Sequence, residues 1–389
     1  MTRQTVIGLI GLVAVGIAAG AAFLIRGEPS GVQAQVTAPA VQDSSGFEQV
    51  TGPTRMRFPE AHGAHPEYQT EWWYFTGNLR DVNGRRFGYQ FTLFRRALAP
   101  ANQVVERPSE WATVQVYMAH FTLSDINGRR HYAFERIARG AAGLAGVRAQ
   151  PFRAWLEDWS IEETPDGLWH LRAAQEGIHL DLRLVDQKGP VLQGDQGYSQ
   201  KGPEPGSAST YYSLTRIAAE GRVTLPGGMV FEVDGTSWMD HEYSTSALAE
   251  DQVGWDWFSI QLDDGTELML YYLRREDGSI DSLSQGTYVT ADGASQPLIY
   301  ADGDFRIDPG RTWRSTQSGG EYPVAWEVLL PTLDMTLHIE ALLDDQENRL
   351  SFAYWEGAVS VAGERAAQPV SGVGYVEMTG YATSMAGQF

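Results

Sequence analysis

The sequence contains no cysteine. Disulfide bonds, thiolate metal sites, a cysteine nucleophile and a lipid-modified cysteine are therefore excluded. Basic residues are also scarce, because 29 Lys and Arg stand against 49 Asp and Glu, for a formal net charge of -20. A surface of this sign repels phosphate backbones, so we expect no nucleic-acid partner. Stability must come from packing, and 389 residues, 43% of them hydrophobic, are enough for two domains.

The N-terminus carries a long hydrophobic run. Residues 6–25, "VIGLIGLVAVGIAAGAAFLI", are uninterrupted by polar residues and flanked by arginines, which predicts an export signal. The length fits either a signal peptide, cleaved after Ala34, or a single anchor. We assign residues 1–34 to a signal peptide or N-terminal anchor and residues 35–47 to a linker. The protein is therefore expected to be exported, periplasmic or extracellular, with the N-terminus in contact with the inner membrane if it is retained.

The rest of the chain has little helical periodicity. Turn sequences such as "DVNG", "DING", "PDG" and "DDG" separate short runs such as "YQFTLF" and "ELMLYYL". Glycine supplies the positive φ that tight hairpins need, and β-branched and aromatic residues that alternate with polar ones are typical of strands. The class is mainly β, with barrels or strongly curved sheets.

An internal repeat divides this β region. The segments 73–96, "WYFTGNLRDVNGRRFGYQFTLFRR", and 257–275, "WFSIQLDDGTELMLYYLRR", share an aromatic pair, a strand, an Asp-Gly turn, a second strand and an Arg-Arg ending. They begin about 180 residues apart, roughly half of the chain without its leader. We predict a duplicated β domain, with domains at residues 48–246 and 247–389.

Aromatic residues make up 11% of the chain and gather in "EWWYFTGNL", residues 71–79. In a strand, Trp72 and Tyr74 point to one face, while Trp73 and Phe75 point to the other. One face is expected to fill a barrel, and the other to meet a neighbouring domain or line a ligand cavity. Packing alone also explains such aromatic residues.

The stretch "GTSWMDHEYST", residues 235–245, concentrates chemistry. If it is a regular strand, Trp238, Asp240 and Glu242 share one face, opposite His241 and Tyr243. His241 is the group best suited to move a proton near neutral pH. No "GxSxG" elbow is present, and a single His with alternating carboxylates lacks the paired histidines of zinc proteases. A buried, hydrogen-bonded structural histidine is the alternative.

A second cluster is "GWDWFSIQL", residues 254–262, where Asp256 falls among apolar neighbours. A buried carboxylate needs a partner, for which His241, Arg274 and Arg275 are candidates, and burial raises its pKa toward the range of a proton donor. Glu356 and Glu377, each beside aromatic residues and glycine, rank below Asp256 and His241.

Several stretches together resemble the CrtC/AttH-like family, which includes the carotenoid 1,2-hydratases (hydroxyneurosporene synthases). They are "HPEYQTEWWYFTGNL", "MAHFTLSD", "YYSLTR", "GTSWMDHEYS", "GWDWFSIQLDDGTELMLYYLR", "YWEGAV" and "GYVEMTGY", from about residue 45 to the end. The resemblance implies two tandem lipocalin-like (calycin) antiparallel β-barrel domains and an apolar ligand. In the hydratase branch it implies acid-catalysed addition of water to an isoprenoid double bond, without a metal or an organic cofactor.

The resemblance also implies residue roles. His241 matches the histidine of the hydratase motif, and Tyr271 and Tyr272 lie in the strand where that branch carries a tyrosine and a catalytic aspartate. This chain departs at two positions, since "MLYYLRR" contains no Asp and Tyr243 stands where the hydratases carry Trp. The candidate catalytic residues are His241, Asp256, Asp240 and Tyr272. The candidate ligand-binding residues are Trp72, Tyr74, Trp238, Tyr243, Trp255, Trp257 and Tyr271.

Three functions are compatible with these features. The first is a cofactor-independent hydratase or lyase that acts on an isoprenoid, with His241 and Asp256 sharing the acid and base roles. The second is a carrier of a hydrophobic isoprenoid or lipid, associated with a membrane transporter. The third is an extracellular structural module, which predicts no accessible cavity.

Overall fold

The computed structural model describes residues 44–104, 108–245 and 248–386, which all lie within one compact unit, Ala40–Phe389. The predicted leader, residues 1–34, and most of the predicted linker lie outside the described residues. Within the described ranges, no helix is long and apolar enough to cross a membrane. The short 3₁₀ turns are η1 (Glu60–His62), η2 (Ala101–Gln103), η3 (Tyr300–Asp302) and η4 (Pro331–Leu333).

The first sheet is antiparallel and runs in the order β4-β3-β2-β1-β13-β12-β9-β8-β7-β6-β5, with β10 and β11 paired to β12. Because β6 also contacts β3 and β4, the two ends of this sheet approach each other, as in a barrel. Its strands are β1 (Thr70–Asp81), β2 (Arg86–Ala97), β3 (Gln115–Asp125), β4 (Arg130–Arg139), β5 (Ala145–Arg148), β6 (Arg153–Leu156), β7 (Trp159–Glu163), β8 (Trp169–Gln175), β9 (Ile178–Asp186), β10 (Pro190–Leu192), β11 (Tyr198–Gln200), β12 (Ala208–Leu225) and β13 (Met229–Ser244).

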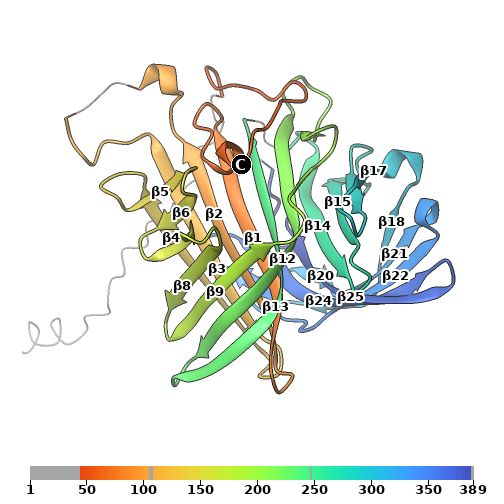
Figure 1. Ribbon diagram of the computed structural model, residues 1–389. Helices are drawn as coiled ribbons and strands as arrows, with labels where there is room; N and C mark the ends of the chain where they lie inside the picture. Colours follow the sequence, from red (N-terminus) through yellow and green to blue (C-terminus); the bar gives the residue numbers. More distant parts are fainter. Residues whose placement is uncertain (1–43, 105–107, 246–247, 387–389) are drawn as a thin grey trace, which may run out of the picture. The chain divides into compact units, whose positions relative to one another are not determined.

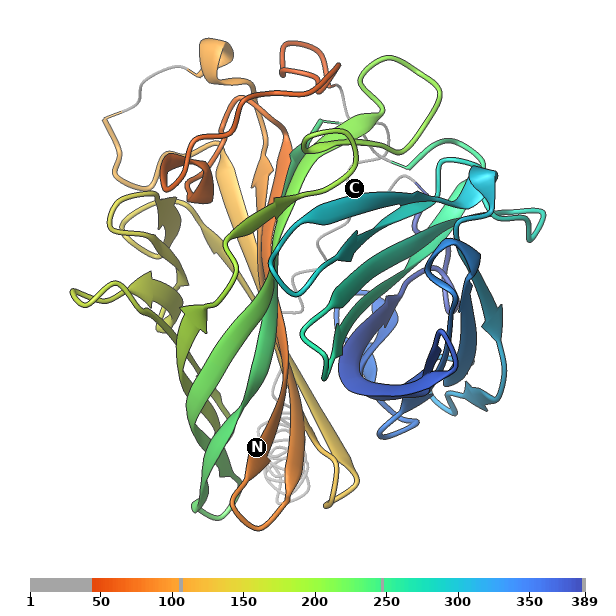
Figure 2. The ribbon, with the colours of Figure 1, turned by 45° about the vertical axis from the view of Figure 1, so that its right-hand side comes forward.

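The second sheet runs in the order β17-β16-β15-β14-β25-β24-β22-β21-β18, with β23 paired to β24. It also curls on itself (Figure 2). Its strands are β14 (Gln252–Leu262), β15 (Glu267–Arg275), β16 (Gln285–Val289), β17 (Ser295–Ile299), β18 (Arg306–Pro309), β21 (Ala325–Leu330), β22 (Met335–Ala341), β23 (Glu347–Arg349), β24 (Ala353–Arg365) and β25 (Gln368–Met378). A separate ribbon pairs β19 (Thr312–Arg314) with β20 (Glu321–Pro323).

The two sheets repeat one topology, and the predicted class of two tandem lipocalin-like barrels is confirmed. In each sheet the first strand pairs with both the second and the last, so β1 lies between β2 and β13 (Figure 1), and β14 lies between β15 and β25. The two repeated sequence segments form the opening hairpins β1–β2 and β14–β15. The predicted domain boundary falls between β13 and β14, at residues 246 and 247, which are not described.

The hairpin turns follow the sequence in most cases. Gly84 and Gly265 have φ values of 82° and 84°, so each supplies the left-handed conformation that its turn requires. At the "DING" turn the positive φ of 52° belongs to Arg129, the residue after the glycine, and not to the glycine itself. There Gly128 is needed for a different reason, since a Cβ atom would stand 2.0 Å from the Asp125 carboxylate.

Side chains alternate along β1 and β13, as the sequence predicts. Trp73 and Phe75 belong to the core inside the first barrel. Tyr74 and Trp238 belong to a different hydrophobic cluster, packed with Trp257 of the second sheet. The second barrel has its own core. The chain therefore builds a third apolar region, in which residues of both barrels meet.

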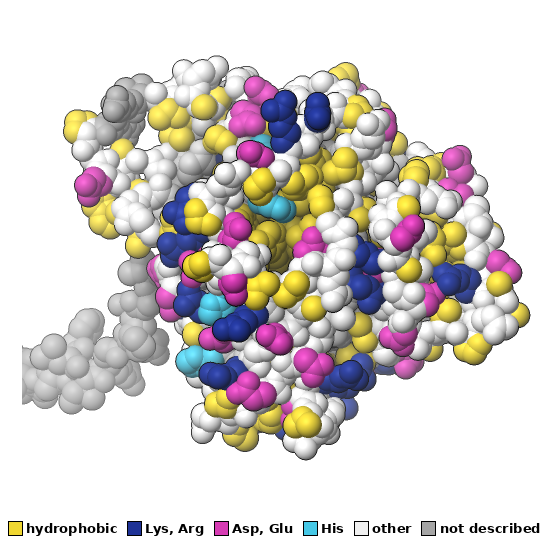
Figure 3. Space-filling view, viewed as in Figure 1, with side chains coloured by type: hydrophobic (Ala, Val, Ile, Leu, Met, Phe, Trp, Pro, Cys, Tyr) yellow, Lys and Arg dark blue, Asp and Glu magenta, His cyan; other side chains and the backbone are white. Residues whose placement is uncertain are grey.

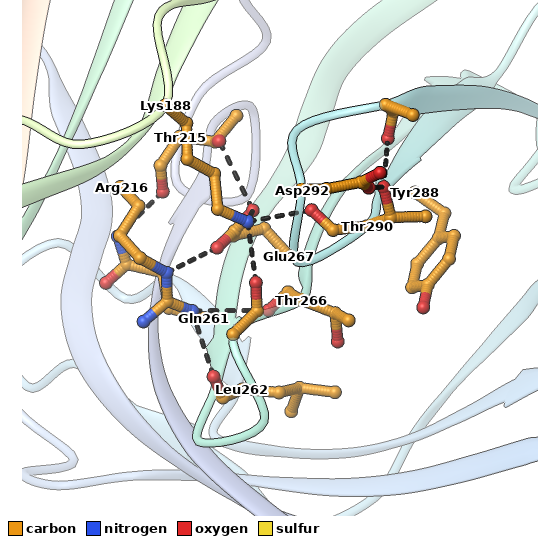
Figure 4. Close-up of polar contacts among 12 residues, drawn as sticks. Lys188, Thr215, Arg216, Gln261, Leu262, Thr266, Glu267, Tyr288, Thr290 and Asp292 are labelled. Atoms are coloured by element: carbon orange, nitrogen blue, oxygen red, sulfur yellow. Dashed lines mark hydrogen bonds and ion pairs between the residues drawn. The ribbon is translucent and has the colours of Figure 1, made fainter.

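A buried ion cluster also joins the two sheets (Figure 4). The Glu267 carboxylate, at the start of β15, is fully buried and binds Lys188 Nζ at 2.7 Å and the Arg216 guanidinium. Lys188 also donates to the carbonyls of Gly265 and Thr290. Because Lys188 and Arg216 come from the first sheet's side and Glu267 from the second, these contacts fix the approach of one barrel to the other.

Candidate functional site: an aromatic cavity with buried acids

A cavity lies in the apolar region between the barrels. Its volume is about 130 Å³, and it is partly open to solvent. It is lined by residues of β1, β2, β12 and β13 from the first sheet and of β14, β15, β24 and β25 from the second. An apolar cavity of comparable size holds a benzene-sized group, so this one can enclose one end of a longer molecule whose remainder extends through the open side. Figure 3 draws one face of the molecule, where a hydrophobic hollow has a histidine side chain at its edge; the lining of the cavity between the barrels contains no histidine.

Aromatic side chains form most of the cavity walls. Five of the predicted ligand-binding residues line it: Trp72, Tyr74, Trp255, Trp257 and Tyr271. Two others do not. Trp238 lies behind the wall and packs edge-on against Trp257, and Tyr243 stacks on His65, with ring centroids 3.8 Å apart. The accessible cavity contradicts the expectation of a purely structural module.

Asp240 is the one predicted catalytic residue that lines the cavity. Its carboxylate accepts hydrogen bonds from Trp238 Nε1 and the Tyr211 hydroxyl, both at 2.7 Å, and from the Ser213 hydroxyl. Burial raises its pKa to about 7, although these donors favour the ionised form. Asp240 is therefore fixed in position and titrates near neutrality.

Glu356 and Glu377 form a second acidic pair in the cavity. They are directly opposed on the antiparallel strands β24 and β25, so their side chains are neighbours. Two effects raise the pKa of Glu356 well above its usual value: burial, which is the larger, and repulsion from the Glu377 carboxylate. Burial also raises the pKa of Glu377 to about 7. Burial therefore favours the protonated form of Glu356, which stands beside a partner that can accept a proton.

The fourth cavity acid is already paired. Glu242 Oε1 binds Lys201 Nζ at 2.6 Å and accepts from the Ser209 hydroxyl. The Lys201 ammonium also stands 4.9 Å from the ring centre of Tyr271 and 5.5 Å from that of Tyr211. Burial is the largest single influence and lowers the pKa of Lys201, but the charge and hydrogen bond of Glu242 together with Tyr271 and Asp240 outweigh it, so the net shift is upward. Lys201 is thus a fixed cation at the cavity wall.

Some polar atoms of the wall lack a hydrogen bond of normal geometry to any described residue. They are the Tyr74 hydroxyl, Gln90 Oε1 and Glu356 Oε1, and all three residues line the cavity. Tyr74 and Glu356 are nonetheless close enough to share a side-chain hydrogen bond, which raises the pKa of Tyr74 and lowers that of Glu356 against the larger effect of burial. Gln90 Oε1 is the atom of these three that has no partner among the described residues.

His241 lies elsewhere, inside the first barrel, on the face of β13 opposite Asp240. Its Nε2 is 2.8 Å from Glu71 Oε1 and its Nδ1 is 3.1 Å from the Tyr212 hydroxyl. The ring stacks on Trp73 and is fully buried, which lowers its pKa. This is the environment of a hydrogen-bonded structural histidine.

The Glu71 network offers three potential metal ligands, because one ligand atom each of His65, Glu71 and His241 lie within 4.8 Å of one another. The Glu71 carboxylate, however, is already neutralised by buried Arg95, whose Nε stands 2.7 Å from Oε2. Adding a divalent cation would bury two uncompensated positive charges. The donor set fits a hydrogen-bond network better than a metal centre.

Asp256 and Tyr272 are also placed away from the cavity lining. Asp256 bonds to Arg274 Nε at 2.9 Å and accepts from the Tyr381 hydroxyl at 3.0 Å. Tyr272 belongs to the core of the second barrel, where its hydroxyl accepts from the Ile307 amide. No hydrogen bond or ion pair among the described residues joins Asp256 to His241, so the structure does not bring these two residues together. The partner of Asp256 is instead Arg274, which the sequence analysis also proposed.

Sequence reasoning ranked Glu356 and Glu377 low and passed over Lys201. The two glutamates are 21 positions apart, and only the register of β24 against β25 shows that they face each other. The aromatic and glycine neighbours shared by "YWEGAV" and "GYVEMTGY" were the available signal. As assembled, the cavity can protonate an apolar group, stabilise a cation on aromatic faces and take a proton from water.

Comparison with known proteins shows which family and which solved structures this chain resembles. The family described as AttH-like matches residues 49–381. A crystal structure of an AttH candidate from Nitrosomonas europaea is 35% identical, covers 86% of this chain and 99% of its own, and superposes with a TM-score of 0.76. Kievitone hydratase from Nectria haematococca is 14% identical, covers 87% of this chain and 98% of its own, and superposes with a TM-score of 0.63. At this identity the similarity shows a shared fold. No curated protein sequence matches the chain.

Proposed function

The chain belongs to the AttH-like family, and on that basis we propose that it is a cofactor-independent hydro-lyase that adds water to an isoprenoid alkene in the cavity between its barrels. One observation carries the proposal. The aromatic cavity contains a carboxyl group, Glu356, whose protonated form is favoured by burial, beside Glu377, whose pKa is about 7. Kievitone hydratase, which shares the fold, is named for a hydration reaction.

The first step is protonation of the alkene by Glu356. Its O–H proton forms a C–H bond at the less substituted carbon, and the π electrons leave a tertiary cation at the other carbon. The faces of Trp255, Trp257 and Tyr74 line the same space and stabilise positive charge through their ring quadrupoles. The ionised fraction of Asp240, held by three donors, adds a fixed negative charge nearby.

The second step is capture of the cation by water. The water oxygen forms the C–O bond, and its proton passes to the Glu377 carboxylate. Because Glu377 is the cross-strand neighbour of Glu356, that proton then returns to Glu356 and restores the starting state. Atoms and charges balance, since alkene and water give an alcohol.

The test uses citronellol, an isoprenoid alcohol with one trisubstituted double bond, in ¹⁸O-labelled water. The full chain is expected to form 3,7-dimethyloctane-1,7-diol with the label at carbon 7, detected by gas chromatography and mass spectrometry. Glu356→Gln should lower the rate about 100-fold or more, because the proton donor is lost. Glu364→Gln is the matched control, since Glu364 lies on the same strand, exposed and outside the cavity lining.

The second candidate function is a carrier of a hydrophobic isoprenoid or lipid. The Lys201–Glu242 ion pair at the cavity wall favours it, because two fixed charges that neutralise each other suit binding rather than proton transfer. Binding of citronellol without labelled diol would support the carrier over the hydro-lyase. Equal rates for the Glu356→Gln and Glu364→Gln variants would contradict the acid role proposed here.

We also propose that the protein works outside the cytoplasm, delivered by the apolar run of residues 6–25. Fractionation of cells that make the full chain should recover it outside the cytoplasmic fraction. N-terminal sequencing beginning at Gln35 would identify a cleaved signal peptide, whereas an intact N-terminus in the membrane fraction would identify an anchor. Recovery from the cytoplasm would overturn the proposal.

A further inference from the structure

The cavity between the barrels contains carboxyl groups that have no positively charged partner. Elsewhere in the described chain, buried carboxylates such as Glu71 and Glu267 bind an arginine or a lysine. Lys201 is the one cation in the cavity lining, and it binds Glu242. The acids of the lining that form no ion pair with a described residue are Asp240, Glu356 and Glu377. A buried carboxylate is either protonated or paired with a cation, so this cavity has capacity for positive charge.

Aromatic rings surround the same space. Its tryptophans are Trp72, Trp255 and Trp257. The faces of such rings attract cations, and rings of this kind enclose quaternary ammonium ions in aromatic cages. The wall already holds one cation in this way, because the Lys201 ammonium stands 5.5 Å from the ring centre of Tyr211 and 4.9 Å from that of Tyr271. Carboxyl groups and aromatic faces therefore line one cavity, and both favour a positively charged occupant.

A buried amide is a second, independent sign of a polar occupant. Gln90 lines the cavity and is 1% exposed. Only one of its two terminal amide atoms has a partner among the described residues, the Thr92 hydroxyl. Turning the amide over exchanges the two atoms and leaves one of them unpaired in either orientation. Because buried polar groups normally find a partner, the cavity suits an occupant that carries a polar group as well as hydrocarbon.

The acids are arranged for an organic cation rather than for a metal ion. A hard divalent cation needs several oxygen ligands that converge on one point. Among the described residues, the one group of three potential ligands within 4.8 Å of one another lies outside the cavity, at His65, Glu71 and His241. The cavity acids come from β13, β24 and β25 and surround a wider space. A trimethylammonium group, close to benzene in size, fits that space.

We propose that the cavity between the barrels binds an organic ammonium ion, with the positive charge between the aromatic faces and the carboxylates of Asp240 and Glu377. The net charge of -20 attracts such a ligand toward the protein. The inference goes beyond the proposed hydration, since binding an ammonium ion needs no reaction. The two proposals share the cavity, because the tertiary cation of the hydration carries its charge in the same place.

The test compares choline with 3,3-dimethylbutan-1-ol, in which a carbon atom replaces the charged nitrogen. The two probes have the same shape and the same hydroxyl group, and neither has a double bond that can be hydrated. Hydrophobicity alone favours the neutral probe, whereas an ammonium site favours choline. Titration calorimetry of the full chain is run at pH 8, where Asp240 and Glu377, with pKa values of about 7, are mostly ionised. Choline should bind at least about ten times more tightly than the neutral probe.

Two substitutions locate the site. Glu377→Gln should weaken choline binding about ten-fold and leave binding of the neutral probe within about two-fold, because only the cation loses a counter-charge. Trp72→Leu should weaken choline binding about five-fold, because one aromatic face is lost. Glu364→Gln and Trp111→Leu are the matched controls, since both residues are exposed and outside the cavity lining. A thermal transition close to that of the wild type shows that each variant is folded.

Phosphocholine distinguishes two sources of the ammonium group. A site for a lipid headgroup binds it at least as tightly as choline, whereas a site for a free amine binds it more weakly, because the cavity acids repel the phosphate.

Equal affinities for choline and 3,3-dimethylbutan-1-ol, tighter binding of the neutral probe, or binding of neither would overturn the ammonium site. A loss of choline affinity in Glu364→Gln as large as in Glu377→Gln would also overturn it. If choline is preferred while citronellol yields no labelled diol, the ammonium site stands and the hydro-lyase proposal fails. Labelled diol without a preference for choline refutes the ammonium site alone.

Discussion

Substitution of His241 distinguishes most clearly between a catalytic and a structural role for this residue. We predict that His241→Gln destabilises the protein and leaves its hydration chemistry largely intact. The histidine does not line the cavity, and its two ring nitrogens are both engaged inside the first barrel, by Glu71 and Tyr212.

The size of the effect follows from the contacts that are lost. A hydrogen bond to a charged group contributes about 1.5–3 kcal/mol, and the stacking of His241 on Trp73 adds roughly 0.5–1 kcal/mol. Glu71 keeps its bonds to Arg95 and His65, so no buried charge is left unpaired. We therefore expect a loss of about 2–4 kcal/mol. With an unfolding entropy of about 0.7 kcal/mol/K for roughly 340 folded residues, Tm falls by about 3–6 °C.

The assay combines calorimetry with citronellol hydration measured at least 15 °C below the Tm of the variant. The expected result is a lower Tm with kcat within about three-fold of wild type, whereas Glu356→Gln shows the reverse pattern. If His241→Gln lowered kcat about 100-fold or more at unchanged Tm, His241 would be catalytic, and the assignment of the reaction to the cavity between the barrels would be refuted.

The remaining predictions concern pH and the contact between the barrels. The hydration rate should fall about ten-fold per pH unit below pH 7, because Glu377 acts as base with a pKa of about 7; a flat profile from pH 5 to 8 would contradict this role. Glu267→Gln should lower the Tm by about 4–7 °C because it removes the buried carboxylate that pairs two largely covered cations, Lys188 and Arg216, while Asp234→Asn, in an exposed ion pair, shifts it by less than about 1 °C; calorimetry of both variants decides. Burial lowers the pKa of His131 to about 4, so its contribution to stability is complete above pH 6.5 and is lost as the pH falls toward 4; urea unfolding should show this slope flattened in His131→Gln, and an unchanged slope would count against it.

Local patterns predict local structure well in this chain. The alternation in "EWWYFTGNL" correctly separates Trp73 and Phe75, inside the first barrel, from Tyr74, at the contact between the barrels. The repeated hairpins correctly predict a duplicated sheet topology. Both inferences need only the strand period of two and a turn with glycine, which are properties of neighbouring residues.

The site depends instead on distant registers. His241 and Asp240 are adjacent in sequence, yet β13 sends one into the first barrel and the other into the cavity. The strand pattern separates the two faces but does not tell which one reaches the second barrel. Glu356 and Glu377 become neighbours only through the pairing of β24 with β25. The partners of Asp256 likewise come from distant parts of the chain, Arg274 from β15 and Tyr381 from the segment after β25.

The cavity takes its walls from both halves of a duplicated chain. Asp240 and Tyr74 come from the first sheet, and Glu356 and Glu377 from the second. Each barrel alone carries only one side of this arrangement, the first Asp240 and Tyr74 and the second the carboxyl pair, so neither half, expressed alone, would retain a complete site. Duplication here did more than enlarge the protein, because it made a new interior surface on which selection could act.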